Sequence, residues 1–492
     1  MTSGSAATAA DGPATAGPGF VKAMTLTDAT MLVAGTMIGS GIFIVSADMA
    51  RLLGSPFLLL LAWFLTGVMT LLGALAYGEM AAMYPRAGGL YVFLREAMGP
   101  LVGFLYGWTL FVVIQTGTIA AVAVAFGRFL GLLVPAVSPD RYAWLPHADI
   151  QTSGALLELG LSPQRLIGLL SIWLLTWINL RGVKEGKFVQ TTLTIVKTAS
   201  IAALVILAVT IGRKADVIAA NFSTGFFGPG VFGAEGFGNA FVLAFGAAMV
   251  GSLFAADAWH GVTSAAAEVQ DPTRNLPRSL LLGAGLVMLL YFLTNVAYLN
   301  VLTLQEVQTA TLDRVGTAAA EAIFGSVGST LMALAILVST FGCNNGLILS
   351  GARVYWAMAR DGLFFRPAAK LNRAGVPAWA LVSQATWTSV LVLSGTYGQL
   401  LDYVIFAALL FYVLTTIGLF ILRVKRPDVP RPYRALGYPW LPALYIVMAA
   451  AVAAILLVAD KTRPQALSGL AVVMVGVPVF FLTRHTVTAD PA

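Results

Sequence analysis

Long apolar windows alternate with short polar segments along almost the whole chain. Each window holds about twenty residues, which at a helical rise of about 1.5 Å per residue is enough to cross a hydrocarbon layer of roughly 30 Å. Because lipid offers the backbone no hydrogen-bond partners, the pattern predicts an all-α integral membrane protein with twelve transmembrane helices. The predicted spans cover residues 26–53, 56–83, 99–134, 164–182, 187–212, 238–267, 279–304, 326–358, 377–395, 400–423, 438–459 and 466–483.

Composition and charge agree with this class. Of the 492 residues, 58% are hydrophobic and 10% are charged. Nineteen of the 29 Lys and Arg residues fall in the N-terminus and in the loops on its side of the membrane. By the positive-inside rule, both termini are expected in the cytoplasm, with the protein in the inner (plasma) membrane. Residues 1–23 are expected to form a disordered tail and residues 484–492 a second tail. This asymmetry accounts for the net charge of +7, so we expect no nucleic-acid partner.

Catalytic and metal-binding patterns are missing from the sequence. The histidines, His147, His260 and His485, are far apart, and Cys343 is the only cysteine. No clustered nucleophile, base or ligand set surrounds them, so we expect neither an enzyme nor a metal or other cofactor. A channel would require a repeated filter loop, which the sequence lacks. Transport is therefore the favoured function.

Two of the predicted helices contain weak helix formers in their middle. The first carries Gly39, Ser40 and Gly41 in "MIGSGIF", and the sixth carries "GSLFAADAWHG" at 251–261. Glycine in a helix costs about 1 kcal/mol relative to alanine, and Gly-Ser pairs are common kink sites. Interrupted helices at matching positions of two halves indicate an inverted repeat with a binding site at the breaks. Close helix packing through small residues is the competing explanation.

A break of this kind has a definite chemistry. The half-helix that begins at the break offers unpaired N–H groups to an anion, and the half-helix that ends there offers carbonyl groups to a cation. An amino acid zwitterion carries both charges on neighbouring atoms. Two facing breaks therefore suit its carboxylate and ammonium groups.

Four charged residues lie inside predicted spans: Glu79, Lys197, Asp257 and Glu268. A charge near the bilayer centre costs roughly 2.5–3.5 kcal/mol and is retained mostly for function. Lys197 lies about ten residues into its span, close to the midplane. It is expected to belong to the coupling site, with a structural ion pair to Glu79 or another acid as the alternative.

Five motifs resemble the amino acid, polyamine and organocation (APC) superfamily, in particular the bacterial relatives of the L-type amino acid transporters. They extend the resemblance over about residues 24–483. They are "GTMIGSGIF", "GEMAAMYPRAGGLYVFLREAMGP", "LFAADAWHGVTSAAAEVQDPTRNLP", "STFGCNNGLILSGARVYWAMARDGL" and "RVKRPDVPRPYRALGYP".

The resemblance implies a five-plus-five inverted repeat with alternating access. Helices 1–5 would occupy residues 24–212, helices 6–10 residues 238–423, and two further helices residues 438–483. The resemblance also implies roles for particular residues. Ser40 and Gly41, next to Gly39, would offer N–H groups to the substrate carboxylate. Carbonyls of Met37, Phe254 and Asp257 would receive the ammonium, and Phe254 would be the gate. Lys197, with Ser339 as its partner, would replace a sodium ion, so transport is expected to need no sodium.

Some expectations stay open at this stage. "AADA" at 255–258 stands where the family usually has glycine. The Asp257 carboxylate would select a cationic side chain, or it would hydrogen-bond to Trp259 or to a helix-end N–H and leave a site for neutral amino acids. Glu268 is expected to contact Arg86 or Arg95 at an inner gate. No cysteine lies in 135–163, so no disulfide-linked heavy subunit is expected.

The expected function is therefore sodium-independent transport of L-amino acids by alternating access, with neutral amino acids as substrates. The mechanism is expected to be either exchange or proton-linked uptake. A carrier of cationic amino acids or polyamines, and a sensor that does not transport, are the alternatives.

Overall fold

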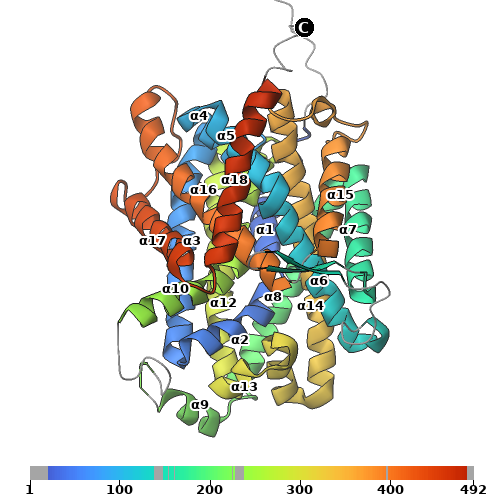
Figure 1. The fold of residues 1–492 in the computed structure, drawn as a ribbon, viewed down its shortest axis with the longest axis vertical. Helices are drawn as coiled ribbons and strands as arrows, with labels where there is room; N and C mark the ends of the chain where they lie inside the picture. The colour runs from blue at the N-terminus through green and yellow to red at the C-terminus, as the bar shows by residue number, and fades with distance from the viewer. Residues whose placement is uncertain are drawn as a thin grey trace, which may run out of the picture.

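Helices make up nearly the whole structure, a computed structural model that describes residues 20–137, 148–152, 155–159, 161–223, 225–227, 238–394 and 397–484. They stand side by side in a bundle, with the first helix at its centre (Figure 1). Of the predicted tails, 1–23 and 484–492, residues 1–19 and 485–492 lie outside the described residues, as do His147 and His485.

Most helices run along the length of the bundle, and shorter ones join them. The longer helices are α1 (Leu26–Met37), α2 (Gly41–Leu53), α3 (Pro56–Met83), α5 (Pro100–Thr109), α6 (Gln115–Leu133), α7 (Pro163–Arg181), α8 (Val183–Val209), α10 (Asn239–Ala255), α12 (Pro272–Val301), α14 (Val315–Arg360), α15 (Ala378–Ser394), α16 (Tyr397–Lys425), α17 (Trp440–Val458) and α18 (Arg463–Arg484). The shorter ones are α4 (Leu90–Met98), α9 (Ala215–Phe222), α11 (Gly261–Ser264) and α13 (Leu304–Gln308).

Each of the twelve predicted spans contains a helix. Within the described part of the chain, eight helices are long and apolar enough to cross a membrane, and the bent pair α1 and α2 makes a ninth. The helices α10 and α15 are apolar but shorter, and α7 is not among those that pass. The class of α-helical, multi-pass membrane protein is therefore confirmed, while the count of twelve and the inverted repeat stay predictions.

Three local features were not predicted from the sequence. Strands β1 (Ala148–Thr152) and β2 (Ala155–Leu159) pair antiparallel within the segment expected to be a loop. The third span is interrupted by a short π-helical turn, η1 (Leu110–Ile114), between α5 and α6. In α14 the backbone kinks at Gly325, where φ is +63°.

Local sequence explains where several helices begin and end. At the start of α1 the Thr25 hydroxyl accepts the backbone N–H of Asp28, whose carboxylate accepts the N–H of Thr25, a reciprocal capping box. Ser55 caps α3 in front of Pro56. The first helical position tolerates proline because the N–H that proline lacks would have no partner within the helix there. Gly54 ends α2 in the left-handed conformation, which glycine adopts without a steric penalty.

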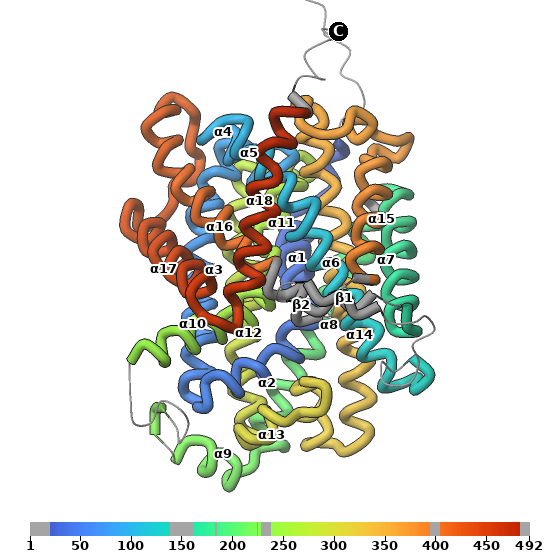
Figure 2. The backbone as a smooth tube through the Cα atoms, viewed as in Figure 1, coloured from blue at the N-terminus to red at the C-terminus, as the bar shows by residue number. Residues whose placement is uncertain are grey.

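The central helix α1 is surrounded by other helices along its length. It packs against α12, α8 and α14, and α12 in turn packs along α3. Figure 2 shows α1 in the middle of the bundle. Large apolar side chains on α7, such as Leu170, Trp173 and Trp177, are exposed, as expected for a face that contacts lipid.

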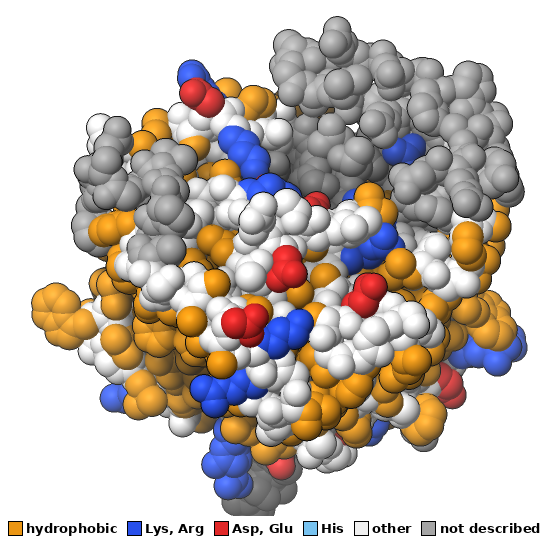
Figure 3. Space-filling model, turned by 90° about the horizontal axis from the view of Figure 1, so that it is seen from below, with side chains coloured by type: hydrophobic (Ala, Val, Ile, Leu, Met, Phe, Trp, Pro, Cys, Tyr) orange, Lys and Arg blue, Asp and Glu red, His pale blue; other side chains and the backbone are white. Residues whose placement is uncertain are grey.

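The end of the molecule that carries α9 and α13 is more polar than its sides. Seen from this end, hydrophobic side chains gather toward the rim and charged ones lie among polar surface in the middle (Figure 3). At exposed positions Arg51 pairs with Asp48 and Asp313, and Lys461 also pairs with Asp48. Such exposed pairs contribute little stability, which fits a face in contact with water.

Small residues let α6 and α7 cross closely, and this leads to a test of the packing. A Cβ at Gly127 would lie 2.5 Å from the backbone oxygen of Gln164. Gly127→Ala is therefore expected to lower the free energy of unfolding by about 1–3 kcal/mol, measured as a lower unfolding midpoint in detergent. In the control Gly285→Ala the nearest atom is 3.8 Å away, so the midpoint should stay or rise. Equal midpoints for the two variants would contradict the close crossing.

Candidate functional site

The first predicted break lies between α1 and α2. The helix ends at Met37, Ile38 is extended with φ −75° and ψ 91°, and α2 starts at Gly41 with its axis bent by 41° from that of α1. Ser40 and Gly41 therefore stand at the N-terminal, electropositive end of α2. The Met37 carbonyl accepts a 2.9 Å hydrogen bond from the Tyr291 hydroxyl.

The second predicted break separates α10 from α11. The α-helix ends at Ala255, residues 256–260 form turns, and α11 resumes at Gly261. Ala258 has φ +64°, a left-handed conformation that costs a non-glycine residue roughly 1–2 kcal/mol. The sequence "AADA" therefore breaks the helix without glycine, and the surrounding packing maintains the strained residue.

The two breaks are in direct contact. A Cβ on Gly41 would lie 2.7 Å from the Cβ of Ala255, so only glycine fits there. The Thr36 hydroxyl, one turn before the first break, donates to the Ala258 carbonyl at 3.2 Å. Between the breaks lies a small cavity, and its lining includes Gly39, Ser40, Gly41, Phe254, Asp257 and Cys343.

Lys197 ties the first break to its neighbours. Its ammonium group, 1% exposed as a residue, donates to the carbonyls of Gly35 at 2.5 Å, Ile38 at 2.7 Å and Ser339 at 3.4 Å. The Ser339 hydroxyl donates to the carbonyls of Ile38 and Gly39 at 3.1 and 2.9 Å. The structure thus brings Lys197 and Ser339 together at carbonyl groups that the unwound backbone leaves without helical partners.

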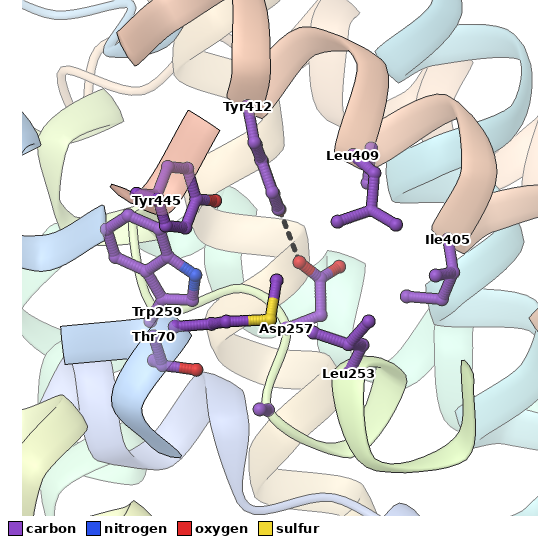
Figure 4. A pocket seen from close by; sticks show the side chains of 11 residues that line it. Thr70, Leu253, Asp257, Trp259, Ile405, Leu409, Tyr412 and Tyr445 are labelled. Atoms are coloured by element: carbon purple, nitrogen blue, oxygen red, sulfur yellow. Dashed lines mark hydrogen bonds between the residues drawn. The ribbon is translucent and has the colours of Figure 1, made fainter. Parts of the chain in front are cut away.

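Asp257 contacts a residue that sequence reasoning missed. Its carboxylate accepts a short hydrogen bond from the Tyr412 hydroxyl on α16 (Figure 4). Of the local partners expected for this carboxylate, a backbone N–H is present at Ala258, whereas the side-chain partner is Tyr412 and not Trp259. The same Tyr412 oxygen lies 2.8 Å from Nε2 of His260. Tyr412 carried no sequence signal, since it lies in an uninterrupted apolar span.

Glu79 does not pair with Lys197, and this alternative is wrong. The Glu79 carboxylate, fully buried, binds Arg423 through two hydrogen bonds of 2.9 and 2.6 Å and contacts Arg431 at 3.3 Å. It also accepts the backbone N–H of Ala435 at 2.7 Å. Glu79 therefore anchors the basic loop after α16 to α3, away from the breaks.

The expected contact of Glu268 with Arg86 or Arg95 is also wrong. Glu268 pairs with the buried Arg353 of α14 at 2.8 Å. Arg86 and Arg95 instead contact Glu96 on α4. The sequence did offer a signal for the true partner, because Arg353 stands alone in an apolar stretch of α14 and a buried arginine requires an anion.

The described residues contain no group of three or more His, Cys, Asp or Glu side chains placed to bind a metal ion. What the described part of the chain does bring together is two facing breaks, a buried ammonium group and a buried carboxylate. Opposed helix breaks inside a bundle of apolar helices are the arrangement found in secondary transporters.

Comparison with known proteins identifies the family. The family model described as amino acid permease matches residues 24–480, so the chain belongs to this family of the APC superfamily. It is 31% identical over 470 residues to the serine/threonine exchanger SteT of Bacillus subtilis, covering 94% of this chain and 97% of SteT. It is 30% identical over 482 residues to the large neutral amino acids transporter small subunit 2 of Rattus norvegicus, covering 96% of this chain and 84% of that protein.

A third relative is the Asc-type amino acid transporter 1 of Mus musculus, 28% identical over 466 residues that cover 94% of this chain and 81% of the relative. These relatives are named as transporters or exchangers of amino acids. The family and the relatives therefore support membrane transport of amino acids as the general function of this chain.

The buried pair of Glu268 and Arg353 leads to a second test. Glu268→Gln leaves the Arg353 charge buried without its partner, which is expected to destabilise the protein by about 3–5 kcal/mol. The measurement is the thermal unfolding midpoint in detergent. Asp48→Asn, which breaks only exposed pairs, is the control and should shift the midpoint little. Similar shifts in both variants would contradict the role of the buried pair.

Proposed function

We propose that the protein is a sodium-independent secondary transporter of neutral L-amino acids that works by alternating access, either as an exchanger or with uptake linked to protons. The observation that carries the proposal is the contact between the two breaks, with the Lys197 ammonium group bound to the carbonyls of the first. We place the protein in the plasma membrane with both termini in the cytoplasm.

The cavity between the breaks suits a zwitterion. Gly39, Ser40 and Gly41 at the start of α2 would bind the carboxylate through N–H groups at the positive end of the helix dipole. Carbonyls at the ends of α1 and α10, those of Met37, Phe254 and Asp257, would receive the ammonium. The Phe254 ring, which lines the same cavity, would close over the bound amino acid as the gate.

Lys197 accounts for the proposed independence from sodium. A sodium ion at a helix break would be bound by oxygen ligands, and here three carbonyl oxygens surround an ammonium group. The fixed positive charge would make an ion unnecessary at this position. Ser339 contributes to the same contact, because its hydroxyl group lies within hydrogen-bond distance of the Ile38 and Gly39 carbonyl oxygens in the unwound segment.

The surroundings of Asp257 favour a neutral substrate. Its carboxylate already accepts the Tyr412 hydroxyl, and the cavity on this side is lined mainly by apolar groups, including Leu253, Ile405 and Leu409 (Figure 4). A cationic side chain would have to compete with Tyr412 for the carboxylate. A carrier of cationic amino acids or polyamines that uses Asp257 is the second candidate, favoured by the burial of this one carboxylate beside the cavity.

Contacts at one end of the bundle would have to part during alternating access. Met24, just before α1, forms a parallel bridge with Val269, just after the sixth span. The Lys187 ammonium group on α8 donates to the Ala23 carbonyl at 2.7 Å and pairs with Asp28 at 2.8 Å. These contacts lie at the ends of the two broken helices that are remote from the breaks, on the side of the N-terminus. We therefore propose that the site is closed on this side in the present conformation.

We expect no disulfide-linked partner subunit. Cys343, the only cysteine, is buried in α14, where its thiol donates to the Thr36 carbonyl. A sensor built on the same fold would bind an amino acid without moving it. Counterflow of amino acid in proteoliposomes separates these cases, because a sensor gives binding and no counterflow.

Sodium independence is tested with purified protein in proteoliposomes. Uptake of a labelled neutral amino acid should proceed at the same rate in sodium, potassium or choline chloride. Lys197→Met should lower the rate by about tenfold or more, because loss of a charged hydrogen-bond donor costs about 1.5–3 kcal/mol. Uptake that requires sodium in the unaltered protein would overturn the proposed role of Lys197.

Substrate charge is tested by competition. Unlabelled alanine, serine or leucine should inhibit uptake of a labelled neutral amino acid, and arginine should not compete at equal concentration. Asp257→Asn removes the carboxylate, and on the cationic alternative it would abolish competition by arginine. Strong competition by arginine in the unaltered protein that disappears in Asp257→Asn would establish the second candidate in place of the first.

A further inference from the structure

Three polar side chains form a continuous hydrogen-bonded chain at the second break. The Tyr412 hydroxyl donates to Oδ1 of Asp257 and lies 2.8 Å from Nε2 of His260. Asp257, His260 and Tyr412 are 7%, 7% and 6% exposed. Because a hydroxyl has one proton, which here goes to Asp257, its oxygen must accept the hydrogen of Nε2.

This assignment leaves the other imidazole nitrogen with a lone pair. Nδ1 of His260 is buried and has no hydrogen-bond partner among the residues that the structure describes. His260 and Asp257 together line a cavity with polar groups from Gln115, Ser264 and Ser350. The chain thus begins at an unpartnered proton acceptor and ends at a carboxylate that also lines the cavity between the breaks.

The groups that face this chain from other helices do not exchange protons near neutral pH. They are phenols and a thiol, whose ordinary pKa values lie above about 8. They comprise Tyr77 of α3, Tyr106 of α5, Cys343 of α14 and Tyr445 of α17. Asp257 and His260 are therefore the groups in this described cluster whose ordinary titration lies between about pH 4 and 7.

Lys197 is a poor carrier of protons for a geometric reason. Its three N–H bonds match three carbonyl oxygens, on Gly35, Ile38 and Ser339. Carbonyl groups only accept hydrogen bonds, so loss of a proton would remove one of these three hydrogen bonds in a buried place. The ammonium group is therefore a fixed structural charge rather than the group that gains and loses a proton in each cycle.

We propose that Asp257, Tyr412 and His260 form one proton-binding site, and that a proton crosses the membrane on this site together with each amino acid. The inference rests on the proposed transport function and names the coupling ion of the same site. Notably, it assigns proton linkage to the second break and leaves the first break, with Lys197, to hold the backbone.

The proton transfer balances within these three side chains. A proton binds Nδ1 of His260, the Nε2–H bond breaks as its proton passes to the Tyr412 oxygen, and the original Tyr412 proton passes to the Asp257 carboxylate. The imidazole stays neutral with its hydrogen on Nδ1, the phenol is regenerated, and the carboxylate becomes a neutral carboxylic acid. The reverse transfers release the proton on the other side of the membrane.

Protonation is coupled to transport through burial. An ionised Asp257 would be enclosed in a low-dielectric interior when the site closes on both sides, and this is costly without a paired cation. Among the described contacts its carboxylate has neutral donors alone, the Tyr412 hydroxyl and the backbone N–H of Ala258. The protonated site closes around the amino acid more readily, so amino acid and proton cross together.

The experiment measures amino acid and proton flux in the same vesicles. Purified protein is reconstituted into proteoliposomes that contain a pH-sensitive dye, and labelled alanine is added outside at acidic pH. We expect the interior to acidify only when alanine is present, with about one proton for each alanine. Uptake should also rise as the external pH falls from about 8 to 6.

Variants locate the site through the ratio of the two fluxes, which does not depend on the amount of active protein. Tyr412→Phe interrupts the chain, and His260→Gln removes its proton acceptor, so both should lower the ratio of protons to alanine severalfold. The control Tyr445→Phe removes a neighbouring phenol hydroxyl that makes no described hydrogen bond to Asp257, and it should keep the ratio of the unaltered protein.

Each outcome decides the inference. Alanine counterflow without any proton movement in the unaltered protein overturns the proton site and leaves the proposed transport function standing. Unchanged ratios in both Tyr412→Phe and His260→Gln place the proton elsewhere and equally overturn it. If the unaltered protein moves no amino acid in either direction, both the inference and the proposed function fail.

Discussion

The ammonium group of Lys197 is the interaction on which the centre of the molecule depends. A helix that unwinds inside an apolar bundle leaves carbonyls without partners, and no water or lipid group can replace them. Lys197 binds the carbonyls of Gly35 and Ile38, and Ser339 binds those of Ile38 and Gly39. Because these donors come from α8 and α14, and Tyr291 of α12 donates to the Met37 carbonyl, the break is held open by helices that are distant in sequence. The first break is thus a product of tertiary structure, although its glycines make it possible.

The second break is held differently, and the contrast organises the site. Its backbone turns through the strained residue Ala258, and its polar side chains point to α16 instead of α8. The first break therefore has a fixed positive charge beside it, and the second has a carboxylate whose only described side-chain partner is a neutral phenol. An amino acid bound between them would have the Asp257 carboxylate in the cavity lining and the Lys197 ammonium group behind the first break.

Much of the fold was accessible from sequence, because burial in lipid imposes long apolar segments and both breaks interrupt them visibly. Gly39 to Gly41 and the "AADA" segment were found for this reason, and Lys197 was singled out as a charge inside an apolar span, which the structure places buried beside the first break. What local sequence did not supply was the pairing of the buried charges, although the isolated Arg353 was a signal that a buried anion is required. Glu79 binds Arg423 and Glu268 binds Arg353 through pairings 344 and 85 residues apart in the chain, which no local pattern encodes. Tyr412 was missed because the apolar sequence of α16 does not indicate which of its faces turns toward Asp257.

The contact between Gly41 and Ala255 has a mechanical consequence. On the two sides of the first break the chain has different neighbours, since α1 packs against α12 and α8 whereas α2 packs against α10. Because Gly41 has no side chain, α2 approaches α10 closely at Ala255, and the two helices are expected to move as one rigid unit. The two breaks then act as hinges at the ends of this unit. Movement of the unit relative to α1 changes the shape of the cavity at both ends of the substrate at once.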